Sequence, residues 1–356
     1  MNRYLIGERQ MARSGAKIGL SADLFDTHGG PMFGTAPLSL LSEAGLAWDI
    51  LPTPEGQLPP SAFTDYEALL IGGSRVSDAE LSKESGRLRV IARNGVGYDA
   101  VDTAALDRRG ILLTNTPIPV RNAVATTAVA FILALSLRLP LKSRLAREGR
   151  WAERADYIGL SGRTLGIVGL GGIGRELVRL VQPYGMAILA ADPHVDPASA
   201  AQAGATLCSL EDLLERSDVV VIACLLGDST RHLLNAERMR LMKPTAYLIN
   251  VARGPIVDEA ALIAALQEER IAGAALDVFE QEPPDPTNPL LTMDNVIVTA
   301  HTAGVTHEAR ANMGKIAAEQ VLDALDGKPV TRIVNPQVWP DYAKRFERTF
   351  GFAPQR

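Results

Sequence analysis

The chain has 356 residues, is 47% apolar and carries a formal net charge of −5. This length exceeds what one ordinary hydrophobic core supports, so we expect about two domains. The acidic balance argues against a nucleic-acid or anionic-membrane partner. Two cysteines, Cys208 and Cys224, are too few for a disulfide framework or a metal cluster, which favours a reducing cytoplasm and no bound metal. The basic start, up to Lys17, lacks the apolar stretch of a signal peptide.

Strand and helix patterns alternate along the chain, which predicts an α/β fold with parallel sheets covered by helices. The expected strands of a first unit are 17–20, 47–51, 68–71 and 89–92. The apolar segment 123–137 is too short to span a bilayer, and it indicates a buried helix from about 121 to 137 that Pro140 stops.

A second series of apolar segments predicts a six-stranded, doubly wound parallel sheet. Its strands are expected near 164–168, 186–191, 218–223, 246–251, 272–277 and 295–299. A helix from about 307 to 325 then leads back to the first unit, so that unit is discontinuous. The expected organisation is an N-terminal arm (1–16), a flavodoxin-like substrate domain (17–117 and 305–337), a Rossmann domain (118–304) and a C-terminal tail (338–356).

A glycine-rich segment opens the second unit. Gly169, Gly171 and Gly174 follow the strand pattern 164–168 and precede a helical run, and Gly172 and Ile173 complete the segment. One glycine permits a tight turn, one lets a pyrophosphate approach the backbone, and one lets helix and strand pack closely. The helix N-terminus supplies N–H donors to the phosphates. With its flanking strand and helix, this segment predicts a dinucleotide site.

An acid, Asp192, ends the next predicted strand, 18 residues after Gly174 (192 − 174). A carboxylate there accepts hydrogen bonds from a ribose diol and repels a 2′-phosphate. Residues 190–194 contain no arginine, so the sequence favours NAD over NADP.

Three further side chains, Arg253, Glu282 and His301, each follow a different predicted strand. Reduction of a 2-keto acid needs a cation for the carboxylate and carbonyl, and a proton donor at the carbonyl oxygen. Arg253 suits the first role because its planar fork holds a carboxylate and stays charged. His301 suits the second because histidine titrates near neutrality. Glu282 can bond the other ring nitrogen and favour the protonated ring, with Glu280 as the competing partner.

The chain resembles the D-isomer-specific 2-hydroxyacid dehydrogenase family from about residue 68 to 336. The resemblance rests on four blocks besides the glycine-rich segment, namely 95–99, 250–259, 275–283 and 301–304. It implies an NAD-dependent oxidoreductase, a homodimer with its active site in a cleft between two domains, and a small 2-keto or 2-hydroxy acid as substrate.

The same resemblance implies further site residues. Asp277 corresponds to the family's cofactor-contacting acid, and the N–H groups around Val96 and Gly97 are expected donors to the substrate carboxylate. Further expected cofactor contacts are Cys224, Val251, Ala252, Arg253, His301 and Gly304.

The substrate is less defined by the sequence. Gly72 stands where phosphoglycerate-type members carry an arginine, which favours a small unphosphorylated acid such as glyoxylate or hydroxypyruvate, although Arg75 could substitute. Phosphoglycerate oxidation therefore stays open, as does an NAD-sensing, corepressor-like binding protein on the same fold. The apolar helix at 123–137 has more apolar surface than its own sheet needs, which predicts a homodimer interface.

Overall fold

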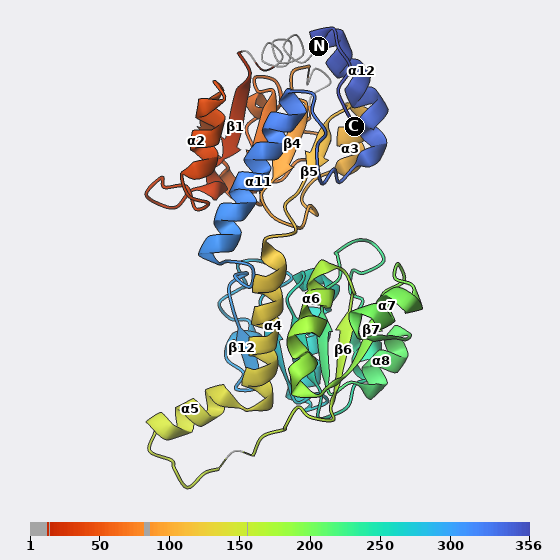
Figure 1. Ribbon diagram of the computed structural model, residues 1–356. Coiled ribbons are helices and arrows are strands. Elements are labelled where there is room, and N and C mark those ends of the chain that lie inside the picture. Colours follow the sequence, from red (N-terminus) through yellow and green to blue (C-terminus); the bar gives the residue numbers. More distant parts are fainter. Residues whose placement is uncertain (1–12, 14, 82–85, 155) are drawn as a thin grey trace. The chain divides into compact units, whose positions relative to one another are not determined.

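The computed structural model describes residues 13, 15–81, 86–154 and 156–356, and the chain divides into two compact units (Figure 1). Unit 1 comprises residues 1–120 and 306–356, and unit 2 comprises residues 121–305. These divisions lie three residues (120 − 117) and one residue (305 − 304) from the boundaries expected from the sequence. Most of the expected N-terminal arm lies outside the described residues.

Unit 1 contains a five-stranded sheet in which all strand pairs are parallel. Its strands are β1 (Lys17–Ser21), β2 (Ala47–Leu51), β3 (Ala68–Ile71), β4 (Val90–Arg93) and β5 (Leu112–Thr114). The order β2-β1-β3-β4-β5 is that of flavodoxin-like sheets. The sequence did not predict β5, because three residues are too few to produce a readable pattern.

Helices cover both faces of this sheet. They are α2 (Ala36–Glu43), α3 (Thr103–Arg108), α11 (His307–Leu325) and α12 (Trp339–Phe350). One buried cluster joins alternate strand residues with α2, α11 and α12, and a second joins the opposite strand face with α3. Helix α11 contacts α2, β3 and β4, so a segment far along the chain completes the N-terminal unit (Figure 1).

The expected C-terminal tail is wrong for most of its length, because residues 339–350 form α12. Tyr342 and Phe346 are 1% and 0% exposed in the core of unit 1. The Tyr342 hydroxyl donates to the Ala324 carbonyl at 2.7 Å. The mixed charge of this segment belongs to the polar face of an amphipathic helix.

Unit 2 contains a seven-stranded parallel sheet in the order β12-β11-β10-β9-β6-β7-β8. Its strands are β6 (Thr164–Val168), β7 (Ala187–Ala191), β8 (Thr206–Leu207), β9 (Val219–Ile222), β10 (Tyr247–Asn250), β11 (Gly273–Leu276) and β12 (Val296–Val298). Counted from β6, the order is 3-2-1-4-5-6-7, the doubly wound Rossmann arrangement with one added strand. The expected number of six was wrong because the edge strand β8 has only two residues.

The helices of unit 2 are α4 (Val120–Ser136), α5 (Leu139–Arg147), α6 (Gly172–Val181), α7 (Pro197–Ala203), α8 (Leu210–Arg216), α9 (Ala236–Met239) and α10 (Glu259–Gln267). Four of them begin after a polar residue whose side chain accepts an amide hydrogen bond of the first turn, which is the usual start signal. These cap residues are Asp196, Ser209, Asn235 and Asp258.

Among the described residues, no single helix is long and apolar enough to cross a membrane. Helices α4 and α5 meet the length and composition criteria only as a pair, and they are bent by 56° at the break between them.

Candidate active site

The predicted site residues of unit 2 gather at one edge of its sheet. Because all seven strands are parallel, the segments that leave their carboxyl ends emerge at the same edge, where ligands bind in doubly wound sheets. The residues that follow the strands there are Gly169–Gly174 after β6, Asp192 after β7, Cys224 after β9, Val251–Arg253 after β10, Asp277 after β11 and His301–Gly304 after β12.

The glycine-rich turn has the geometry that its sequence predicts. Gly169 has φ +97°, and a Cβ there would lie 2.7 Å from the Cys224 backbone. A Cβ on Gly174 would collide with the Gly169 carbonyl, so helix α6 can approach β6 only with glycine at this position. A Cβ on Gly171, in contrast, would meet no atom within 4 Å. The turn therefore offers open space and N-terminal amides to a pyrophosphate.

Asp192 links this turn to the loop after β7. Its carboxylate accepts from the Leu170 amide at 2.8 Å and from the His194 amide at 2.9 Å. The acid is thereby fixed beside the glycine-rich turn, where a ribose diol is bound in Rossmann sheets. Cys224 lies on the other side of the turn, and burial raises the pKa of its thiol to about 11, so the thiol stays protonated near neutral pH.

Arg121 was not predicted as a site residue, yet it lies at the same turn. A Cβ on Gly172 would be 2.8 Å from Cζ of Arg121, so the guanidinium group rests against the first residue of α6. Next to it, Asn122 donates to Glu176 at 2.8 Å, which joins α4 to α6. The signal in the sequence was a lone arginine in the first turn of the long helix, 51 positions before Gly172 (172 − 121).

His301 and Glu282 form a hydrogen-bonded pair. Nδ1 of His301 lies 2.7 Å from Oε2 of Glu282, and the other carboxylate oxygen accepts from the Phe279 amide at 3.0 Å. Glu280, the competing partner, instead lies 2.7 Å from Nε2 of His232. Of the two glutamates that the sequence offered, Glu282 is thus the one at His301.

The charges around Glu282 favour its ionised form. Burial by itself would raise the pKa of this carboxyl. The hydrogen bonds from His301 and Phe279, together with the positive charges of His301 and Arg253, outweigh burial and hold the pKa below its ordinary value. Arg253 therefore lies close enough to be felt electrostatically at the His301–Glu282 pair.

The loop that carries Arg253 is held at both ends. Asn250, which is fully buried, accepts from the Ala252 amide at 3.0 Å and donates to the Arg253 carbonyl at 2.9 Å. A Cβ on Gly254 would collide with the Phe279 backbone, so this turn lies directly against the segment that leads to Glu282. Asn250 was part of a motif block in the sequence, but its role in shaping the loop could not be read there.

Asp277 lies at the end of β11 and is 2% exposed. Its carboxylate accepts hydrogen bonds from residues 299, 302 and 303, the segment that contains His301. The family resemblance implies that Asp277 contacts the cofactor. In the structure its carboxylate is hydrogen-bonded to residues 299–303, which we call the histidine loop.

The expected substrate contacts Val96 and Gly97 belong to unit 1. They follow β4, and the turn is held by the Gly95 amide, which donates to Thr116 Oγ1 at 2.8 Å, and by Asn115, which donates to the Val96 carbonyl at 2.9 Å. Gly72 follows the neighbouring strand β3, so it lies at the same sheet edge as this turn. A Cβ on Gly72 would be 2.8 Å from the carboxylate of Asp23.

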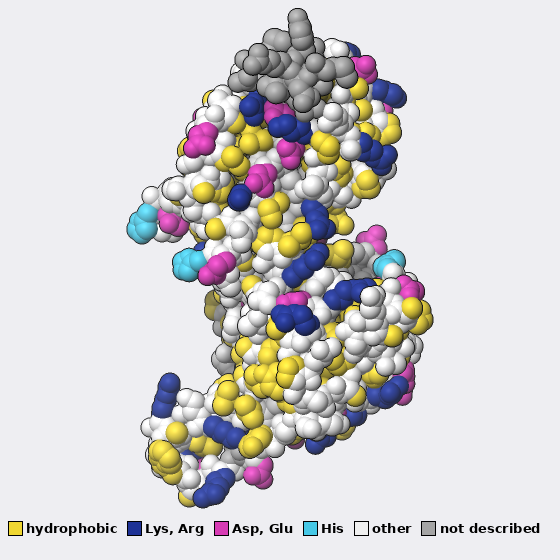
Figure 2. All heavy atoms as spheres, in the orientation of Figure 1, with side chains coloured by type: hydrophobic (Ala, Val, Ile, Leu, Met, Phe, Trp, Pro, Cys, Tyr) yellow, Lys and Arg dark blue, Asp and Glu magenta, His cyan; other side chains and the backbone are white. Residues whose placement is uncertain are grey.

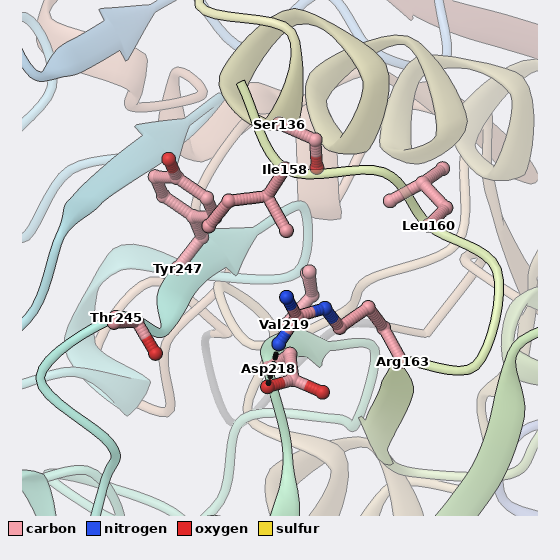
Figure 3. Close-up of a pocket in the computed structure, with 8 residues that line it drawn as sticks. All are labelled: Ser136, Ile158, Leu160, Arg163, Asp218, Val219, Thr245 and Tyr247. Atoms are coloured by element: carbon pink, nitrogen blue, oxygen red, sulfur yellow. Dashed lines mark ion pairs between the residues drawn. The ribbon is translucent and has the colours of Figure 1, made fainter. Parts of the chain in front are cut away.

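A small pocket lies elsewhere in unit 2, at the amino ends of the strands (Figure 3). It is lined by Ser136, Ile158, Leu160, Arg163, Asp218, Val219, Thr245 and Tyr247. Arg163 and Asp218 form an ion pair of 3.6 Å on its wall. None of the predicted site residues lines it, and the carboxyl edge remains the candidate site. In the described part of the chain, no three His, Cys, Asp or Glu side chains are arranged to hold a metal ion.

A Rossmann sheet with this glycine-rich turn and a fixed acid after its second strand defines the NAD-binding class of α/β proteins. Comparison with known proteins agrees, since residues 129–303 match the model of the "D-isomer specific 2-hydroxyacid dehydrogenase, NAD binding domain". A glyoxylate reductase of Thermofilum pendens is 38% identical over 323 residues, which cover 85% of this chain and 91% of the relative.

Two other relatives widen the picture. A D-3-phosphoglycerate dehydrogenase of Archaeoglobus fulgidus is 39% identical over 77% of this chain, although the match spans only 53% of that longer protein. The crystal structure of a D-lactate dehydrogenase of Aquifex aeolicus with NAD and lactic acid superposes with a TM-score of 0.79 at 26% identity, covering 89% of this chain and 99% of that one. The chain belongs to the D-isomer-specific 2-hydroxyacid dehydrogenase family and is an NAD-dependent oxidoreductase.

Proposed function

We propose that the protein reduces a small, unphosphorylated 2-keto acid to the D-2-hydroxy acid with NADH, or catalyses the reverse oxidation. The observation that supports this most directly is the 2.7 Å pair of His301 and Glu282 at the carboxyl edge of the NAD-binding sheet, with Arg253 close by. Proton donor, orienting carboxylate and cation are the groups that carbonyl reduction needs.

In this proposal each side chain has a separate role. NADH supplies the hydride to the carbonyl carbon. Since Nδ1 of His301 is bonded to Glu282, the ring gives its proton to the carbonyl oxygen from Nε2. Glu282 fixes the ring orientation and stabilises the imidazolium form. Arg253 holds the substrate carboxylate and polarises the carbonyl.

The position of the Asp23 carboxylate favours the proposal that the substrate has no second anionic group. It occupies the space beside Gly72, and the Gly73 amide donates to it at 2.6 Å. A phosphate or second carboxylate at this sheet edge would face the negative charge of Asp23, at the position where the family resemblance leads us to expect an arginine in phosphoglycerate-type members. Arg75 is exposed and stands three residues after Gly72. It is the cation that a phosphorylated substrate would use instead.

A substrate panel tests this proposal. NADH oxidation is measured with glyoxylate, hydroxypyruvate, oxaloacetate and 3-phosphohydroxypyruvate. We expect kcat/KM for the first two acids to exceed that for the last two by at least about tenfold, because one unfavourable charge contact costs about 1.4 kcal/mol or more. Asp23→Asn should narrow the difference, whereas Asp65→Asn, an exposed acid elsewhere in unit 1, should leave it unchanged.

Two results would contradict the proposal. A preference for 3-phosphohydroxypyruvate that Arg75→Gln abolishes would identify a phosphoglycerate dehydrogenase. Tight NADH binding without turnover of any 2-keto acid would favour the NAD-sensing binding protein.

We also propose that the protein acts as a cytoplasmic homodimer. Helix α4 leaves Thr126 and Ala130 exposed and Val129 and Leu133 only half-buried. Figure 2 shows hydrophobic side chains gathered over the part of unit 2 where Figure 1 draws α4 and α5. A second copy of this chain would bury that surface. The presence of only two cysteines supports the proposed cytoplasmic location, because proteins of oxidising compartments more often carry disulfide frameworks.

A further inference from the structure

One buried carboxylate connects to most of the segment that carries His301. Oδ1 of Asp277 accepts from the Thr299 hydroxyl at 2.6 Å and from the Thr302 amide at 2.8 Å. Oδ2 accepts from the Ala303 amide at 3.0 Å. A buried carboxylate is expensive unless it is hydrogen-bonded, so these three contacts constrain both partners strongly.

The backbone of Asp277 holds the histidine itself. Its carbonyl accepts from the His301 amide at 2.7 Å. His301 has φ +54°, a left-handed conformation that side chains with a Cβ adopt only where their surroundings enforce it. The hydrogen bonds on both sides of His301 therefore maintain a conformation that the residue would not choose alone.

Asp277 also begins the segment that leads to Glu282, five residues later (282 − 277). Glu282 is thus connected to the end of β11 through the chain itself. His301 is connected to it through the hydrogen bonds that residues 299–303 make with Asp277. Separation of residues 299–303 from Asp277 would change the 2.7 Å contact between the imidazole and the carboxylate.

We propose that Asp277 is a positioning residue, which holds residues 299–303 so that the His301 ring meets Glu282 and faces the reacting carbonyl. This inference rests on the proposed function, since it assumes that His301 transfers the proton. It differs from the cofactor contact that the family resemblance implies. A carboxylate has about four acceptor sites, and three are used by the histidine loop, so the loop is the main partner.

Two kinds of variant separate positioning from cofactor binding. Asp277→Asn keeps the shape but turns an NH₂ group toward one of the amide donors, which repels it. Thr299→Val removes one hydrogen bond and leaves the acid intact, and Thr299→Ser restores the hydroxyl. Thr292→Val is the matched control, because this hydroxyl donates only to the Pro289 carbonyl in an exposed turn.

The kinetic arm measures kcat, the NADH dissociation constant and the pH profile with the best 2-keto acid. We expect Asp277→Asn to lower kcat by about 10- to 100-fold, the usual effect of misplacing a catalytic group by about 1 Å. The NADH dissociation constant should stay within about threefold. Thr299→Val should lower kcat by about three- to tenfold in the same way, and Thr299→Ser and Thr292→Val should resemble the unchanged protein.

The structural arm does not depend on turnover. Amide hydrogen exchange of residues 299–303 should accelerate by about tenfold or more in Asp277→Asn and in Thr299→Val, with little change at the glycine-rich turn. If no 2-keto acid is reduced, the proposed function fails while this arm still tests the positioning role. If Asp277→Asn does not fold, the Thr299 pair carries the test.

Either of two results would overturn the inference. One is a tenfold weaker NADH affinity in Asp277→Asn with kcat unchanged at saturating NADH, which would make Asp277 a cofactor contact. The other is unchanged exchange of residues 299–303 in both variants.

Discussion

At the scale of single residues, the site depends on side chains that hydrogen bonds to backbone groups of the same or a neighbouring loop hold in place. Asp192 accepts from two amides on two loops, Glu282 accepts from the Phe279 amide, and Asn250 bonds both Ala252 and Arg253. Such hydrogen bonds fix an orientation before a ligand arrives, which lowers the entropic cost of binding and of the reaction.

Asp192 sets the expected cofactor preference. We predict a strong preference for NADH over NADPH, and Asp192→Ala should narrow it because the charge that repels a 2′-phosphate is gone. The ratio of kcat/KM for the two cofactors is the measurement. Asp196→Ala, an acid at the start of α7, is the control. Equal kcat/KM values for both cofactors in the unchanged protein would exclude this role for Asp192.

Glu282 sets the expected pH dependence. The pKa of its carboxyl is held below the ordinary value, so Glu282 is ionised in the neutral range and places a negative charge 2.7 Å from Nδ1 of His301. Reduction uses imidazolium and should fall as pH rises, whereas oxidation uses the neutral ring and should rise. Glu282→Gln removes the negative charge, so both limbs should move to lower pH.

The control for this prediction is Glu280→Gln, which changes the carboxylate paired with His232. Its pH profile should match that of the unchanged protein. If the pH profile of Glu282→Gln instead matches that of the unchanged protein, a group other than Glu282 controls the protonation state of His301.

At the scale of secondary structure elements, the parallel strands of unit 2 determine where the candidate active site lies. Helix α4 supplies the surface that we propose for the contact with a second copy of the chain. Each of the predicted site residues of unit 2, Glu282 included, stands within six residues of a strand's carboxyl end. Helix α4 has a different position, because Arg121 reaches the glycine-rich turn at its start while its later turns leave small and apolar side chains partly exposed.

The exposed side of α4 is the expected dimer contact. We predict that light scattering at micromolar concentration gives the mass of two chains, and that Ala130→Arg gives the mass of one, because a buried unpaired charge is costly at an interface. Ala201→Arg, an exposed alanine on α7, should leave the mass unchanged. A monomeric unchanged protein would refute the homodimer.

At the scale of the whole molecule, the sequence predicted what depends on local pattern and missed what depends on distant contacts. The two α/β units, most strands and the glycine-rich turn were readable because periodicity and turn residues are local. The strands β5 and β8 were too short to read, and α12 owes its order to burial of Tyr342 and Phe346 in a core built by distant segments.

The same limit applies to the site. Arg253, Glu282 and His301 could be chosen because each follows a strand pattern. The hydrogen bonds of Asp277 join residues 22 to 26 positions apart, and the contact of Arg121 with Gly172 joins segments on either side of α5. Nothing in the local sequence distinguishes these contacts from those of ordinary surface residues, so they became visible only in the folded chain.

The most direct test of the central claim, that His301 protonates the carbonyl while NADH reduces it, is the steady-state rate of His301→Ala with saturating NADH and the best 2-keto acid. We predict that kcat falls by roughly two to four orders of magnitude, the usual contribution of a positioned acid, with a much smaller change in NADH affinity. His232→Ala, which removes the histidine paired with Glu280, should retain activity. Near-normal turnover in His301→Ala would contradict the account, because the proton would then come from another group.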